Sequence, residues 1–66
     1  MKIIAHTPHG TFESKESEYS DEGFEALERF LERIANLTYF SFELEDDQSI
    51  YMTKAMIDQS VFILQK

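Results

Sequence analysis

Two histidines, His6 and His9, are the residues whose type and spacing best suit a metal site. They flank Thr7 and Pro8, so a turn here brings the imidazole rings near each other, and imidazole nitrogens bind transition metals. A stable site needs three or four ligands, and no other residue stands at a position that specifies one. We therefore interpret both as exposed or strand-end histidines. A small metal or ligand sensor that uses His6 and His9 is kept as an alternative.

Carboxylates are the other group that could do chemistry, and they are densest at Glu43, Glu45, Asp46 and Asp47. A calcium loop of the EF-hand type needs oxygen ligands at alternate positions over about twelve residues, with a glycine at the sixth. This segment has no glycine and no such spacing. It is predicted to be a solvated turn between two strands, because Asp and its polar neighbours favour turns.

Motifs of catalysis are missing from the sequence. Gly10 and Gly23 stand alone, so no phosphate-binding loop is predicted, and without cysteine there is no thiol nucleophile, disulfide or thiolate zinc site. A chain of 66 residues has little core with which to enclose a substrate. We expect the protein not to be an enzyme and to need no metal or cofactor.

One helix is predicted from about Ser20 to Ala35. Apolar residues recur there at spacings of three and four, at Phe24, Leu27, Leu31 and Ile34, with Phe30 widening the stripe. Ser20 is a suitable N-cap residue. The helix also carries the acids from which a partner-binding face is predicted, namely Asp21, Glu22, Glu25, Glu28 and Glu32.

The remaining elements are predicted to be strands. They fall at Lys2 to Thr7, Thr11 to Ser14, Thr38 to Leu44, Ser49 to Thr53 and Ser60 to Gln65, with room for one helical turn at 54–59. The order ββαβββ indicates an α+β fold, a small antiparallel sheet with one helix packed on a face, against Phe40 and Phe42. Residues 1–66 are too few for a second domain.

Aromatic residues also fall on the side of the sheet that this helix does not cover. Tyr39 and Tyr51 alternate with the apolar positions Phe40 and Met52, so they point to the opposite face. Small domains with a limited core often cover such a face by self-association. We expect a homodimer that forms through Tyr39 and Tyr51.

The charge is strongly negative, at −7, with 13 acidic residues against six Lys and Arg. Residues 13–32 hold eight of the acids and two of the bases, so this segment alone carries −6. Such a charge repels phosphate backbones and anionic lipids, and the longest apolar run, Val61 to Leu64, is far too short to span a bilayer. We expect a cytoplasmic protein that binds neither nucleic acid nor membrane directly.

The C-terminal third, Ser49 to Leu64, resembles the ending of many small bacteriophage proteins, in which a strand, a short turn with Lys54 before Ala55 and Met56, and a strand beginning Ser60-Val61 close the chain. The acidic, cysteine-free composition is similar to that of accessory proteins of tailed phages, including cyanophages. This resemblance implies a small virion-associated or host-directed protein that acts by binding, and it carries no active site.

The leading interpretation is therefore a non-enzymatic protein-binding module. Its acidic helix face would contact a protein partner with a basic surface. The main alternative is a nucleic-acid mimic that occupies the cleft of a DNA-binding protein, which needs carboxylates at phosphate-like spacing along an extended surface.

Overall fold

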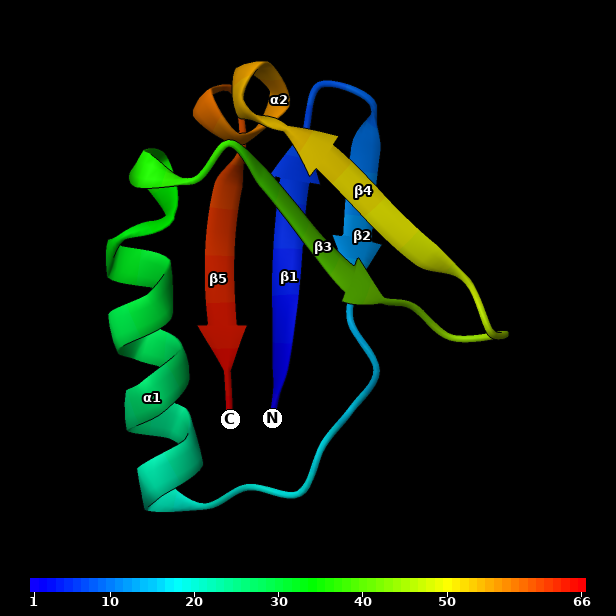
Figure 1. Cartoon of the computed structure of the whole chain (residues 1–66). Helices are drawn as coiled ribbons and strands as arrows, with labels where there is room; N and C mark the ends of the chain where they lie inside the picture. Colours follow the sequence, from blue (N-terminus) through cyan, green and yellow to red (C-terminus); the bar gives the residue numbers. More distant parts are fainter.

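The computed structural model describes all residues from 1 to 66 and confirms the α+β class and the ββαβββ order. Its elements are β1 (Lys2–Thr7), β2 (Gly10–Glu13), α1 (Asp21–Glu32), the 3-10 turn η1 (Ile34–Asn36), β3 (Tyr39–Glu43), β4 (Ser49–Thr53), α2 (Lys54–Asp58) and β5 (Val61–Gln65) (Figure 1). The single turn of helix expected between the last two strands is α2. Neither helix has the length and apolar character needed to cross a membrane.

The five strands form two antiparallel sheets rather than one. β1 is the centre of a three-stranded sheet in the order β2-β1-β5, and β3 pairs only with β4. In the first sheet Ala5 lies opposite both Phe12 and Phe62. In the β3–β4 hairpin Phe40 lies opposite Met52. The hairpin crosses in front of β1 and β2, so the two sheets face each other (Figure 1).

The core fills the space between the sheet and the hairpin. Five residues are buried: Ile3, Ala5, Phe40, Met52 and Ile57. The Phe40 ring lies 5.5 Å from the rings of Phe30 and Phe42 and 5.6 Å from that of Phe62, measured between centroids. Phe40 therefore joins α1, the hairpin and β5 in one cluster.

The long helix α1 flanks β5 at the side of the molecule (Figure 1). Ser20 caps it, because the Ser20 Oγ accepts a hydrogen bond from the Gly23 N–H at 3.0 Å. A Cβ at position 23 would lie only 2.8 Å from that oxygen and 2.9 Å from the Met1 Cε, so a larger residue there would displace one of these side chains. No residue of α1 is fully buried, although Leu27 packs against the core, as does Ile34 of η1.

Two short segments hold the hairpin in place. The Lys15 N–H donates to the Glu43 carbonyl at 3.0 Å, which ties the chain after β2 to the end of β3. In the predicted turn between β3 and β4, Asp46 and Asp47 adopt φ values of 62° and 57°, a left-handed conformation that Asp tolerates.

We expect Phe40→Ala to lower the free energy of unfolding by about 3 to 5 kcal/mol, because it empties the centre of the aromatic cluster. Urea denaturation measures the change. Thr53→Ala is the control, since Thr53 is an exposed hairpin residue whose hydroxyl does not cap α2; it should change the stability by less than about 0.5 kcal/mol. Equal effects of the two substitutions would contradict this account of the core.

Candidate protein-binding surfaces

Four of the five predicted helix acids form one line along α1. Asp21, Glu25, Glu28 and Glu32 are spaced by three and four residues, which places them on one helix face, and all are exposed. We call these four residues the acidic stripe. Glu22 is also exposed but lies about 100° around the helix from Asp21, so it borders the acidic stripe rather than belonging to it.

Few positive charges neutralise the acidic stripe. Its one ion pair joins Glu25 Oε2 to Arg29 Nη2 at 3.7 Å, and both side chains are largely exposed. Asp21 accepts a hydrogen bond of 2.8 Å from the Tyr19 hydroxyl, which raises the pKa of Tyr19. Exposed pairs of this kind are weak and are screened by salt. Most of the negative charge of the acidic stripe is therefore available to a partner.

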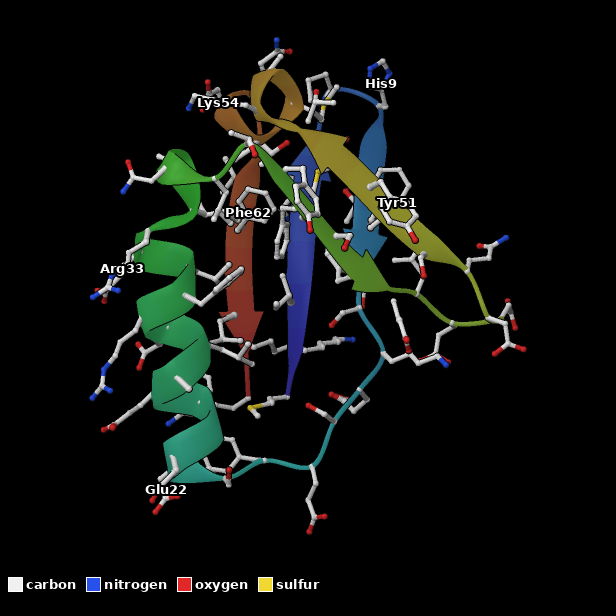
Figure 2. All side chains as sticks on the ribbon, viewed as in Figure 1. His9, Glu22, Arg33, Tyr51, Lys54 and Phe62 are labelled. Carbon is white, nitrogen blue, oxygen red and sulfur yellow. The ribbon has the colours of Figure 1, made fainter.

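The two predicted self-association residues lie together on the outer face of the hairpin. Tyr39 is 67% exposed and Tyr51 is 76% exposed. The register pairs Tyr39 with Thr53 and Ser41 with Tyr51, so the two tyrosines are diagonal neighbours. We call Tyr39 and Tyr51 the tyrosine face. Figure 2 shows the Tyr51 side chain on the front of β4, away from the three-stranded sheet.

A second apolar surface lies on the opposite side of the molecule, on the outer face of the three-stranded sheet. Val61 is 61% exposed, Ile63 is 43% exposed, and Ile4 lies directly opposite Ile63. The predicted self-association residues do not include Val61 and Ile63, although their alternation with Phe62 and Leu64 indicates that β5 is apolar on both faces. The total accessible area of 4722 Å² exceeds the roughly 4,400 Å² expected for a monomer of this mass.

The two histidines occupy different sides of the sheet. His6 lies on the outer face, where its Nδ1 is 2.9 Å from Thr11 Oγ1. His9 is in the turn after β1 (Figure 2). It borders an open hollow of about 310 Å³, which is also lined by Phe12, Tyr51 and Met52. No group of three or more His, Cys, Asp or Glu side chains is placed to hold a metal ion.

No protein-family model, no curated protein and no solved structure matches the chain.

Proposed function

We propose that the protein is a small binding module that acts in the cytoplasm on another protein, without catalysis, through the acidic stripe of α1. The observation that carries the proposal is the single line of Asp21, Glu25, Glu28 and Glu32 with only one weak ion pair along it. A partner with a basic surface complements such a line. The resemblance of residues 49–64 to endings of small phage proteins supports a host-directed or virion-associated role.

Protein binding agrees with the dimensions of the acidic stripe better than mimicry of nucleic acid. Its carboxylates advance by about 4.5 or 6 Å along the helix axis, a wider interval than the roughly 3.4 Å between successive charges of one strand along the axis of duplex DNA. From residue 21 to residue 32 the line is also only about 16 Å long, which matches a short basic groove rather than a DNA-binding cleft. Mimicry stays the alternative, and displacement of the partner by duplex DNA would favour it.

We also propose that two copies associate through the tyrosine face. Tyr39 and Tyr51 are the most exposed of the large apolar side chains, and they are diagonal neighbours on the hairpin. Burial of two such rings in each copy removes a large apolar area from water. A closed two-fold pair is the commonest arrangement of identical subunits.

Reversal of charge on the acidic stripe tests the first proposal. The variant is Glu25→Lys/Glu28→Lys. Each exchange replaces a negative charge with a positive one and raises the net charge by two, so the net charge changes from −7 to −3. We expect proteins retained from host-cell lysate by the immobilised wild type to bind this variant at least tenfold more weakly, because like charges would meet.

The control for that experiment is Glu43→Lys/Glu45→Lys, which changes the net charge equally at the far end of the hairpin. Binding by the control should stay within about threefold of the wild type, and added salt should weaken wild-type binding. If the two variants bind alike, net charge rather than the acidic stripe determines binding.

The dimer is tested by light scattering at micromolar concentration, where the wild type should give twice the chain mass of 7.8 kDa. Tyr39→Glu/Tyr51→Glu should give the monomer mass with unchanged circular dichroism, because charges would be buried at the interface. The matched control is Val61→Glu/Ile63→Glu on the opposite face, which should leave the dimer intact. A monomeric wild type, or a dimer disrupted only by the control, would refute the proposal.

A further inference from the structure

The outer edge of β3 has no strand beside it. The Glu43 carbonyl accepts a hydrogen bond from the Lys15 N–H, so this carbonyl points away from β4. The N–H of the next residue, Leu44, points to the opposite side and donates to the Gln48 carbonyl, just before β4. Backbone groups alternate along an antiparallel strand, so the N–H and C=O of Ser41 and Tyr39 point to the same side as those of Glu43. No other main-chain group bonds to Ser41 or Tyr39.

This edge borders an apolar groove between β3 and α1. Two open hollows of about 330 Å³ and 270 Å³ share Phe30 and Leu37 in their walls. The first extends along α1 to Arg29 and Arg33, and the second extends to Tyr39 and Ser41. We call the two hollows together the β3 groove. Phe30 is 41% exposed, so the groove leaves an aromatic ring in water.

Both arginines of the chain lie on this groove, and Arg33 has no partner. Three of the four lysines pair with acids, and the fourth lies over aromatic rings: Lys2 with Glu13, Lys15 with Glu43 and Asp47, Lys54 with Asp58, and Lys66 with Tyr19 and Phe24. Arg33, which follows the last residue of α1, makes no ion pair or hydrogen bond with its side chain, and this side chain points into solvent (Figure 2). The one unpaired cation of an acidic protein therefore stands beside an uncovered apolar groove.

We propose that the β3 groove binds an extended acidic peptide segment of a partner protein as a third strand of the hairpin. Its backbone would pair with Ser41 and Tyr39, and alternate apolar side chains would cover Phe30 and Leu37. Its carboxylates would meet Arg33 and Arg29, since guanidinium groups bind carboxylates through paired hydrogen bonds. The acids of the acidic stripe do not line the groove, so this proposal and the proposed function can fail independently.

The probe is a fluorescein-labelled, end-blocked octapeptide of alternating Glu and Val, compared with its Lys and Val counterpart by fluorescence anisotropy. We expect the acidic peptide to bind at least tenfold more tightly. The comparison is decisive because the net charge of −7 favours the basic peptide wherever it binds nonspecifically. Equal or tighter binding of the basic peptide, or no binding of the acidic one, would overturn the proposal.

Two matched proline variants identify the edge. Ser41→Pro removes an N–H that points outward from β3, and Ser49→Pro removes one from the opposite edge of the same hairpin, at the position paired with Glu43. Ser41→Pro should weaken binding of the acidic peptide at least tenfold, and Ser49→Pro should leave it within about twofold. The reverse result, or equal loss in both, would exclude strand addition at β3.

Two further measurements test the proposal even if a proline variant does not fold. Arg33→Ala should weaken binding of the acidic peptide roughly tenfold. A version of the peptide N-methylated at alternate residues, which cannot donate to the Ser41 and Tyr39 carbonyls, should lose binding to the wild type. Unchanged affinity in either measurement would contradict the proposal. Light scattering with the Ser41→Pro variant shows whether a second copy of the chain occupies the groove instead, which would also overturn it.

Discussion

The packing of Phe40, on the inner face of the hairpin, against the three-stranded sheet is the contact on which the rest of this fold depends. Its ring touches one aromatic residue from each of three elements: Phe30 of α1, Phe42 of β3 and Phe62 of β5. Only five residues of the chain are buried, so no second cluster could take over this role. The tyrosine face and the β3 groove are both positioned by it, because Tyr39 and Ser41 are the neighbours of Phe40 on β3.

Local periodicity predicted the elements but not how the strands pair. The three-to-four spacing of apolar residues marked α1, and alternation marked β3 with Phe40 inward and Tyr39 outward. The division into two sheets depends on β1 pairing with β5, from which it is distant in sequence, and alternation within a strand does not specify its partner. Phe30, expected only to widen the apolar stripe, became the aromatic contact of α1 with Phe40 because α1 lies beside β5.

The binding surfaces were likewise predictable from the sequence only in part. Helical spacing was enough to align four of the predicted acids, and strand alternation was enough to place Tyr39 and Tyr51 on one exposed face. The β3 groove was not predictable, because its walls come from α1 and β3 and their separation is set by η1 between them. The spacing of His6 and His9 suggested proximity, but a residue in a strand and a residue in the following turn were placed on different sides of the sheet.

The pairing of β1 with β5 also determines when this chain can fold. Ile4 and Ile63 are directly opposite although 59 residues separate them, whereas Ala5 and Phe12 in the β1–β2 hairpin are seven residues apart. Closing the longer loop costs about 2 kcal/mol more in chain entropy. β5 is also the last of the five strands to be synthesised, and an isolated hairpin such as β1–β2 is at best marginally stable in water. The three-stranded sheet therefore cannot form progressively from β1 onward, because its central strand gains its second partner only once β5 has been made.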